Sequence, residues 1–395
     1  MEKDKISKFT QEMELLKAFL ADHYRFRRNV ITGGIEYACG GNTVGTLHDG
    51  PWLPLTKEVM NRITLDAIEA NIEVWDKDLR RYVESTYVSD YDPVADYLSS
   101  LPRWDGRERI RRLAERVPTE NREWPRYFHR WFLGMVAQWL SDRPLHGNTM
   151  VPLIVGRQGD GKSTFCRLLL PDELQPYYTD RLDFAKRTET ERMLTRFVLI
   201  NVDEFDSISR PQNAFLKHLL QKSDVMVRKL YETVVQQRKR YASFIATTND
   251  PTPLTDPTGS RRFLCIQTCG VIDTKRPVNH AQLYAQAKTE IERGARTWFD
   301  RAEERRIQLS NTVFQQYDSV EAVFMEMFHH PSAGEPVERL SPYQMLARMR
   351  RRYPSLQVNL SAAQKLGRLL VRQKFRAVRK SACRVYDVAF SGVSE

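Results

Sequence analysis

The chain has 395 residues, which is long enough for two or three domains with a sizeable buried core. Hydrophobic residues make up 41% of it and charged residues 28%, a balance that excludes an intrinsically disordered chain. The 61 Lys and Arg residues outnumber the 50 Asp and Glu residues, and the net charge of +11 suggests a polyanionic partner. A merely solvated basic surface would have the same composition.

The sequence contains neither a membrane segment nor a secretory signal. The best apolar run, residues 131–140, stops far short of the roughly 20 residues that a membrane-spanning helix needs. The first five residues carry charges of both signs and lead into no apolar segment, so we expect a cytoplasmic protein that does not insert into membranes. The five cysteines are scattered and odd in number, which favours free thiols.

The first 96 residues have the pattern of a small, mainly helical domain. Apolar residues recur at helical spacing in residues 15–20 and 59–74, and the glycines within residues 33–41 predict the turn of a hairpin between them. A Pro and Asp-Gly turn at residues 101–106 then marks a domain boundary. Two further helices are expected beyond it, at residues 107–117 and 127–140.

Three short, β-branched runs indicate an α/β core, which we expect over residues 97–300. The runs are almost continuously apolar, as expected of strands that are buried on both faces of a parallel sheet. They comprise residues 150–155, 197–202 and 244–248. Helical periodicity returns at residues 281–299 and 312–328, so we expect a helical connector over residues 301–336 and a separate module over residues 337–395.

A glycine-rich loop follows the first of these strands. Gly156, Gly161, Lys162 and Ser163 fill the pattern Gly, four residues, Gly-Lys-Ser, and a helical run begins at Lys162. Such a loop wraps backbone N–H groups around phosphate oxygens, its lysine reaches the β- and γ-phosphates, and its serine binds Mg²⁺. We therefore predict a P-loop for ATP and Mg²⁺, with the nucleotide held by Gly156, Gln158, Gly159, Asp160, Gly161, Lys162, Ser163 and Thr164.

Two acidic residues end the second strand. Asp203 and Glu204 follow the apolar run directly, at the edge where an open parallel sheet binds its ligands. We predict that Asp203 holds Mg²⁺ together with Ser163, and that Glu204 is the general base. An acidic cap of the next helix is the alternative interpretation, and it loses weight once the P-loop is accepted.

Two more features fit a phosphoryl-transfer site. Asn249 ends the third strand, where its amide can bond the γ-phosphate or the attacking water, although a turn-forming asparagine is the alternative. Arg261 and Arg262 follow, and arginine suits the charge that develops on a transferring phosphoryl group, although an ordinary surface pair is the alternative. The predicted catalytic residues are Lys162, Asp203, Glu204, Asn249, Arg261 and Arg262.

Between the second and third strands, residues 224–240 have the pattern of an inserted hairpin with cations on both arms. Lysine and arginine can contact phosphates there, while an exposed tyrosine stacks on a base. A hairpin edge that its cations protect against aggregation would have the same sequence. The predicted nucleic-acid contacts are Arg228, Lys229, Tyr231, Arg238, Lys239 and Arg240.

In order and spacing, these motifs resemble the virulence-associated protein E (VapE) family, P-loop proteins of phages and genomic islands related to superfamily 3 helicases within the AAA+ class. The resemblance begins near Tyr97 with residues 101–110, passes through the P-loop and Asp203, and closes at residues 256–263. It implies a homo-oligomer, a hexameric ring with ATP at the subunit interfaces. It also implies that Arg261 or Arg262 acts on a neighbouring subunit and that the hairpin grips single-stranded or forked DNA.

The C-terminal segment resembles a winged helix. Two helices are expected at residues 342–352 and 362–373, followed by two strands at residues 376–379 and 383–388. Residues 339–395 contain 13 Lys and Arg residues but only two acids, so the entire net charge of +11 lies in this segment. We therefore expect this module to contact nucleic-acid phosphates.

These features predict an ATP-hydrolysing, nucleic-acid-dependent motor. The family resemblance implies that this motor is a superfamily 3-like DNA helicase that acts in the replication of a phage or mobile element. The alternative is an ATP-switched DNA-binding regulator, or a defence-type signalling ATPase, that unwinds nothing.

Overall fold

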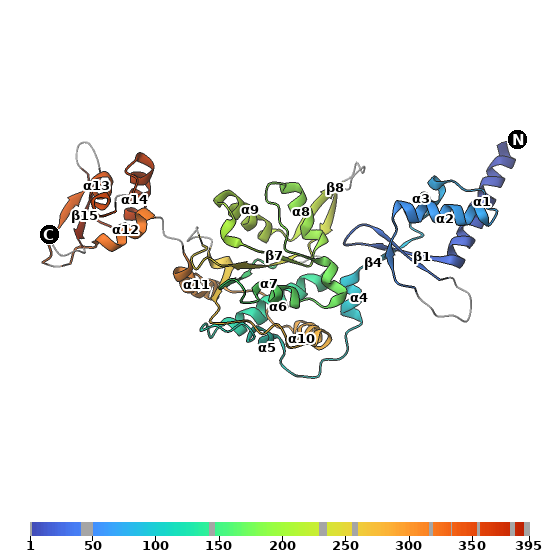
Figure 1. Cartoon of the computed structure of the whole chain (residues 1–395), viewed down its shortest axis with the longest axis horizontal. Helices are drawn as coiled ribbons and strands as arrows, with labels where there is room; N and C mark the ends of the chain where they lie inside the picture. The colour runs from blue at the N-terminus through green and yellow to red at the C-terminus, as the bar shows by residue number, and fades with distance from the viewer. Residues whose placement is uncertain are drawn as a thin grey trace. The chain divides into compact units, whose positions relative to one another are not determined.

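The computed structural model describes residues 2–40, 50–141, 147–228, 235–254, 260–315, 319–332, 334–353, 356–379 and 384–390. The chain divides into two compact units (Figure 1). One comprises Met1–Pro251 and Thr258–Asn311, and the other comprises Thr252–Pro257 and Thr312–Glu395. No helix in the described part of the chain is long and apolar enough to cross a membrane.

The N-terminal part combines helices with a small sheet. The expected hairpin is present as an antiparallel pair, and two further strands extend it to four in the order β3-β2-β1-β4. Strand β1 alternates aromatic and arginine side chains, so its period is that of a strand although half of its residues are charged. The elements are α1 (Glu2–His23), β1 (Tyr24–Asn29), β2 (Ile35–Cys39), β3 (Leu53–Pro54), α2 (Lys57–Glu69), α3 (Asp76–Val83), β4 (Ser89–Tyr91) and α4 (Pro93–Ser99).

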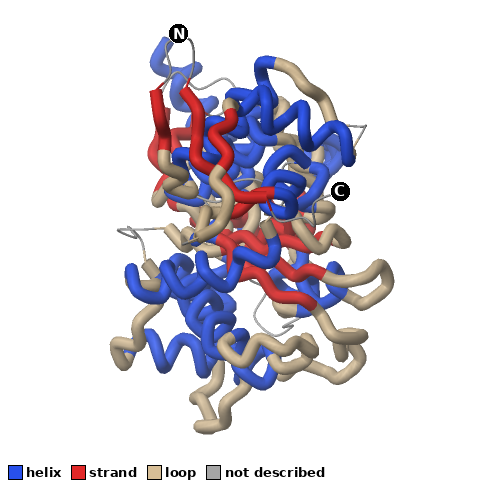
Figure 2. The backbone as a smooth tube through the Cα atoms, turned by 90° about the vertical axis from the view of Figure 1, so that its left-hand side faces the viewer, coloured by secondary structure: helices blue, strands red, loops and turns tan. Residues whose placement is uncertain are grey.

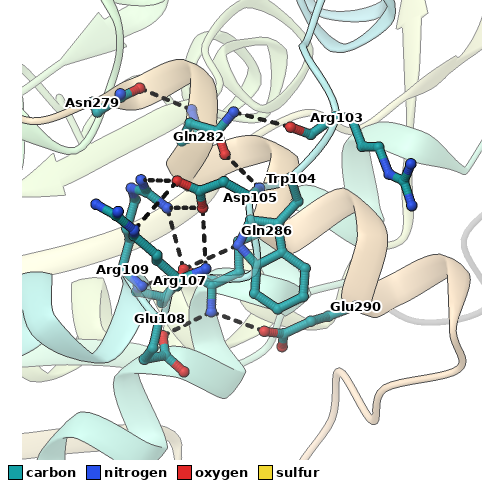
Figure 3. A network of polar contacts seen from close by, with 11 residues as sticks. Arg103, Trp104, Asp105, Arg107, Glu108, Arg109, Asn279, Gln282, Gln286 and Glu290 are labelled. Atoms are coloured by element: carbon teal, nitrogen blue, oxygen red, sulfur yellow. Dashed lines mark hydrogen bonds and ion pairs between the residues drawn. The ribbon is translucent and has the colours of Figure 1, made fainter.

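The motif at residues 101–110 anchors the chain to helix α10 (His280–Glu292), as Figure 3 shows. The Asp105 carboxylate accepts two hydrogen bonds of 2.6 Å from the Arg109 guanidinium, which holds the pKa of Asp105 well below its ordinary value. The Asp105 amide donates to Gln282 at 2.9 Å, and the Arg109 amide donates to the buried Gln286 at 2.7 Å. This motif, which the sequence indicated as a turn at a domain boundary and as part of the family resemblance, therefore fixes one side of the core.

A five-stranded sheet of parallel strands lies at the centre of the core. Its order is β11-β5-β10-β7-β6, and every pairing in it is parallel. The predicted α/β class with a parallel sheet is confirmed, and the three predicted strands are its three inner members. The strands are β5 (Val151–Val155), β6 (Tyr178–Thr179), β7 (Leu199–Val202), β10 (Ser243–Thr248) and β11 (Phe263–Gln267).

Helices lie on both sides of this sheet (Figures 1 and 2). Helices α8 and α9 lie on one side, and α5, α6 and α10 lie on the other (Figure 1). Aromatic side chains dominate the packing on the α6 side, where Phe128 contacts both Trp131 and Phe165. The helical segments are α5 (Ile110–Ala114), α6 (Trp124–Leu140), α7 (Lys162–Leu168), η1 (Asp172–Tyr177), α8 (Arg187–Arg196), η2 (Phe205–Ser207), α9 (Arg210–Gln221), η3 (Ser260–Arg262), α11 (Arg301–Ser310) and η4 (Asn311–Phe314).

The predicted basic hairpin is present as β8 (Asp224–Arg228) paired with β9 (Val235–Lys239). Directly after it, Arg240 is fully buried, so the prediction that Arg240 contacts nucleic acid is wrong. Its guanidinium donates to five main-chain carbonyls, among them those of Leu219, Leu220 and Lys222 at the end of α9. The physical reason is that the last carbonyls of a helix need donors, and a long cation supplies several at once.

The second unit has its own apolar core. Its sheet has the order β12-β15-β13, with β14 on β15, and all pairings are antiparallel. Helix α12 contributes Phe324 to this core beside Leu346 and Leu366, so this helix belongs to the second unit, whereas we expected a connector there. The elements are α12 (Ser319–Met327), β12 (Phe328–His329), β13 (Glu338–Leu340), α13 (Pro342–Arg352), α14 (Leu360–Arg372), β14 (Ala377–Arg379) and β15 (Arg384–Phe390).

Arg240→Ala is expected to destabilise the first unit, because the buried carbonyls it leaves without a donor each cost about 1–3 kcal/mol. We expect the melting temperature in scanning calorimetry to fall by more than about 5 °C. Arg181→Ala removes the same side chain from an exposed position and should change the melting temperature by less than about 2 °C. If the two variants have the same melting temperature, Arg240 does not stabilise the end of α9.

Candidate nucleotide site

The glycine-rich loop connects β5 to α7 in a conformation that depends on two of its glycines. Gly161 caps α7 with a φ of 86°, in the left-handed region that residues with a Cβ atom rarely adopt. At Gly156, an added Cβ atom would lie 2.2 Å from the Thr268 hydroxyl oxygen. Both positions therefore require glycine: Gly161 because of its positive φ, and Gly156 because a Cβ atom there would clash with Thr268.

Asp160 stabilises the conformation of this loop through hydrogen bonds. Its carboxylate accepts hydrogen bonds from the Arg157 amide at 2.8 Å and from the Thr268 hydroxyl at 2.9 Å. Its carbonyl accepts from the Ile272 amide at 2.9 Å, so the loop is attached to the segment that follows β11. Among the described residues, neither Asp160 nor Gly156 lines the pocket in front of the loop. Both act on the shape of the loop.

Lys162 is a cation with little exposure to solvent. Its side chain reaches back across the loop, and its Nζ atom lies 2.9 Å from the Gly156 carbonyl and 2.7 Å from the Arg157 carbonyl. The third acceptor is the Asn249 side-chain oxygen at 2.9 Å. The residue is only 8% exposed, and this burial lowers the pKa of the ammonium. Within the described part of the chain Lys162 takes part in no ion pair, so its charge is available to an anionic ligand.

Asp203 joins the loop to the ends of two strands. It follows β7 directly, and its carboxylate accepts a hydrogen bond from the Ser163 hydroxyl at 3.1 Å. The second carboxylate oxygen accepts from Thr247, which lies near the end of β10. The sequence did not point to Thr247, because a threonine in an apolar strand carries no local sign of its partner. A hydroxyl and a carboxylate side by side are the hard oxygen donors that Mg²⁺ prefers.

Glu204 lies at the front of the pocket in an unusual backbone conformation. Its φ is 50°, which is uncommon for a residue with a side chain, and residues held in this way cluster at functional sites. No side chain in the described residues bonds to its carboxylate, which is exposed. The pocket has a volume of about 360 Å³ and is lined by Gln158, Gly159, Gly161, Lys162, Ser163, Thr164, Asp203, Glu204, Thr248 and Asn249.

The two predicted catalytic arginines lie elsewhere. Arg261 and Arg262 form η3 directly before β11, and β5 and β11 are parallel neighbours. The loop begins where β5 ends, so the arginines are separated from it by about the length of a five-residue strand, roughly 16 Å. Arg261 instead bonds Glu304 at 3.2 Å. Within one chain, neither arginine reaches the pocket.

Of the remaining residues predicted to contact nucleic acid, Arg228, Arg238 and Lys239 belong to the basic hairpin. Arg228 ends β8, and Lys229 and Tyr231 lie outside the described residues. Arg238 is half-buried, and the Lys239 ammonium donates to the Trp139 carbonyl at 2.6 Å.

A second group of potential metal ligands lies between α5, α6 and α10. Ligand atoms of Glu108, His129 and Glu290 lie within 4.8 Å of one another. Gln286 already donates to both carboxylates, at 2.7 and 2.8 Å (Figure 3). The His129 Nε2 atom lies 2.8 Å from the Glu290 carboxylate. These contacts explain the group without a metal ion.

Comparison with known proteins supports one assignment. The sequence matches the virulence-associated protein E-like domain over residues 98–316, which is more than half of the chain. A search of curated proteins found no significant match. Three solved structures that resemble the chain are all of the C-terminal region of NrS-1 in its apo form. They are 10–11% identical, with TM-scores of 0.44–0.47, and the matches cover 95–96% of this chain and 99% of theirs.

TM-scores below 0.5 carry no argument about function, so the assignment rests on the sequence match. That match contains the motif at residues 101–110, the glycine-rich loop, Asp203, Glu204, Asn249 and both arginines. The predicted family resemblance is therefore confirmed. The chain belongs to the virulence-associated protein E-like domain family.

Proposed function

We propose that the chain is an ATP-hydrolysing, nucleic-acid-dependent motor with a P-loop core of the superfamily 3 helicase-like AAA+ type. The observation that carries the proposal is the meeting of Lys162, Asp203, Glu204 and Asn249 in one pocket. These residues lie up to 87 positions apart in the sequence. Lys162 begins α7 after the loop that follows β5, and the other three follow the neighbouring strands β7 and β10. A pocket at the carboxyl ends of parallel strands is where an open α/β sheet binds its ligand.

Nucleotide binding begins with Lys162. Phosphate oxygens of ATP are stronger acceptors for a buried ammonium than the two carbonyls and the amide that now surround it, because they carry charge. Gly159 and Gly161 of the loop line the same pocket, and backbone N–H groups of such a loop can donate to phosphates. Lys162 therefore binds the phosphate chain and neutralises part of its charge.

Ser163 and Asp203 are the residues that would hold Mg²⁺. Their oxygens already lie 3.1 Å apart, and a hydroxyl and a carboxylate fit a hard, oxygen-binding cation. When bound with ATP, Mg²⁺ neutralises charge on the β- and γ-phosphates. Thr247 holds the second oxygen of Asp203, so the carboxylate keeps its orientation toward Ser163.

Glu204 is the proposed general base. Its carboxylate accepts a proton from water while the water oxygen bonds to the γ-phosphorus, and the bond from that phosphorus to the bridging oxygen breaks. The products are ADP and inorganic phosphate. Asn249 lines the pocket between Lys162 and Asp203, from where its amide can orient the water or the γ-phosphate.

Completing the site requires a second subunit. Arg261 and Arg262 lie at the opposite edge of the sheet from the pocket of their own chain. We propose that in a homo-oligomer, a hexameric ring by family resemblance, one of them reaches the γ-phosphate of the neighbouring subunit. This is the geometry of an arginine finger acting in trans.

The proposed partner is single-stranded or forked DNA, bound at the hairpin of β8 and β9. By family resemblance, the motor acts in the replication of a phage or mobile element. The alternative is an ATP-switched DNA-binding regulator, which the strongly basic C-terminal segment also fits.

One experiment tests the proposal and separates it from the alternative. Phosphate release from ATP is measured with and without single-stranded DNA, and unwinding of a labelled fork is followed in the same mixture. A motor releases phosphate faster with DNA and opens the fork. A regulator binds DNA in an ATP-dependent way but leaves the fork closed. The absence of phosphate release contradicts the motor, and DNA binding that ATP does not change contradicts the regulator.

Lys162→Ala is expected to weaken ATP binding about 10- to 150-fold, because one charge-assisted hydrogen bond of about 1.5–3 kcal/mol is lost. Isothermal titration with ATP and Mg²⁺ measures the effect. Lys186→Ala, at an exposed position outside the pocket, is the matched control and should bind as the wild type does. Equal affinities for the two variants would show that Lys162 does not contact the phosphates.

Glu204→Gln is expected to bind ATP normally and to hydrolyse it about 10²- to 10⁴-fold more slowly, because glutamine cannot take up the proton. Titration gives the affinity and phosphate release gives the rate. Glu189→Gln makes the same exchange at an exposed site on α8 and should keep the full rate. Wild-type turnover by Glu204→Gln would refute its role as the base.

Mixing two inactive variants tests whether the arginines act between subunits. The Arg261→Ala/Arg262→Ala chain keeps an intact pocket, and the Lys162→Ala chain keeps intact arginines. If the finger acts in trans, a mixture regains ATP hydrolysis that neither variant has alone. A mixture of Lys162→Ala and Glu204→Gln contains no intact pocket and should regain nothing. No recovery in the first mixture contradicts the trans arrangement.

A further inference from the structure

Helix α14 of the C-terminal unit is amphipathic, and no acidic residue lies on its outward face. The buried residues of α14 are Ala362, Ala363, Leu366, Leu369 and Leu370. At 100° per residue these five side chains lie on one side of the helix, and residues 361, 364, 365 and 368 lie on the other. The outward face is therefore formed by Ser361, Gln364, Lys365 and Arg368.

The composition of this face is suited to reading bases. The 13 residues of α14 include no acid, so the outward face carries hydrogen-bonding groups and cations beside the exposed apolar residues Leu360 and Val371. Glutamine can bond both edge atoms of an adenine, arginine can bond both edge atoms of a guanine, and serine can bond either. Val371, next on the same face, is 57% exposed and can contact a thymine methyl group. Serine, glutamine and arginine can also bond phosphates, so this face suits both the base edges and the backbone of a duplex.

Acidic residues of this unit form ion pairs with arginines other than the Arg368 named above. Glu321 pairs with Arg372 at 2.8 Å, Glu326 lies 3.6 Å from Arg352, and Asp387 pairs with Arg339 at 3.0 Å. Among the described residues, no carboxylate lies within ion-pair distance of Arg350, Arg351 or Arg368. Arg368 on α14 and Arg350 and Arg351 in the last turn of the adjacent α13 are therefore left without an acid among the described residues, whereas Arg372 and Arg352 have one.

The hairpin of β14 and β15 adds a second, independent sign of a polyanionic partner. Arg379 and Arg384 are cross-strand neighbours in this antiparallel pair, and both are exposed. Like charges directly opposite each other destabilise a hairpin. A bound polyanion would remove that repulsion. The pairing of Arg379 with Arg384 is therefore suited to binding a polyanion and adds nothing to the stability of the hairpin.

The shape of the unit fits one class of nucleic acid. A helix with its side chains is about 10–12 Å across, which matches the width of about 12 Å of the major groove of B-form DNA. Helix α14 is about 20 Å long, enough to cross that groove with its outward face against the base edges. The major groove of an RNA duplex is too narrow for side chains to read.

We infer that the C-terminal unit recognises a specific sequence of duplex DNA. Helix α14 enters the major groove, Gln364 and Arg368 bond base edges, and Arg350, Arg351, Arg379 and Arg384 bind phosphates on either side. The unit thus selects the site at which the chain acts, a role that needs no ATP hydrolysis. This goes beyond the proposed motor, whose DNA contact at the β8–β9 hairpin is independent of sequence.

The test is a selection with the full-length chain, without nucleotide, from a library of DNA duplexes with randomised sequence. We expect one sequence to be enriched. Gln364→Ala and Arg368→Ala should each bind that sequence about 5- to 150-fold more weakly and bind a scrambled duplex as the wild type does. Gln373→Ala, an exposed position just beyond α14, is the matched control and should leave both affinities unchanged.

Phosphate contacts should behave differently. Arg350→Ala/Arg351→Ala should weaken binding to the selected and scrambled duplexes equally and reduce the slope of log affinity against log salt by about 2. All these positions are exposed, so unchanged melting temperatures are expected and verify folding. The inference is overturned if no sequence is enriched, if Gln364→Ala and Arg368→Ala weaken both duplexes equally, or if only single strands or RNA bind.

Failure of this inference and failure of the motor can be told apart. The Lys162→Ala chain should retain the full sequence preference, because α14 belongs to a different unit from the ATP pocket. Conversely, Arg368→Ala should retain basal ATP hydrolysis.

Discussion

The site depends on one constraint, the burial of the positive charge of Lys162. Its ammonium is held by three uncharged oxygens, two of them from the very loop that it follows. Removing an ammonium from water is costly, and the lowered pKa of Lys162 is a sign of that cost. A polyphosphate in the pocket would offset this cost, which supports the proposed anionic ligand. The glycines and Asp160 then serve to hold the loop in the shape that keeps Lys162 buried.

The order of the strands explains how the other groups meet this cation. Strand β10 lies between β5 and β7, so Asn249 at its end lies between Lys162 and the carboxylate of Asp203. Thr247, two residues earlier, orients that carboxylate. The same polarity of the strands keeps Arg261 and Arg262 at the opposite edge. The chain therefore has the pocket at one end of its sheet and the two arginines at the other. This arrangement supports the proposal that each subunit of a homo-oligomer supplies an arginine to the pocket of its neighbour.

Much of the core could be predicted because its signals are local. A glycine pattern after an apolar strand identified the loop, and polar residues after two more such strands identified Asp203 and Asn249. Arg240 was misplaced for the opposite reason. Its neighbours Arg238 and Lys239 made it part of a basic run, and only the fold shows that its side chain turns inward to the end of α9. Thr247 and Thr268 were missed because their partners are distant in sequence.

The central claim is that the loop around Lys162 binds a phosphate chain, and the length of that chain tests it most directly. The wild-type protein is titrated calorimetrically with ATP, ADP and AMP in the presence of Mg²⁺. Because the proposal places Lys162 and the loop at the β- and γ-phosphates, ATP and ADP should bind at least about 100-fold more tightly than AMP. AMP binding as tight as that of ATP, or no binding of ATP, would contradict the account.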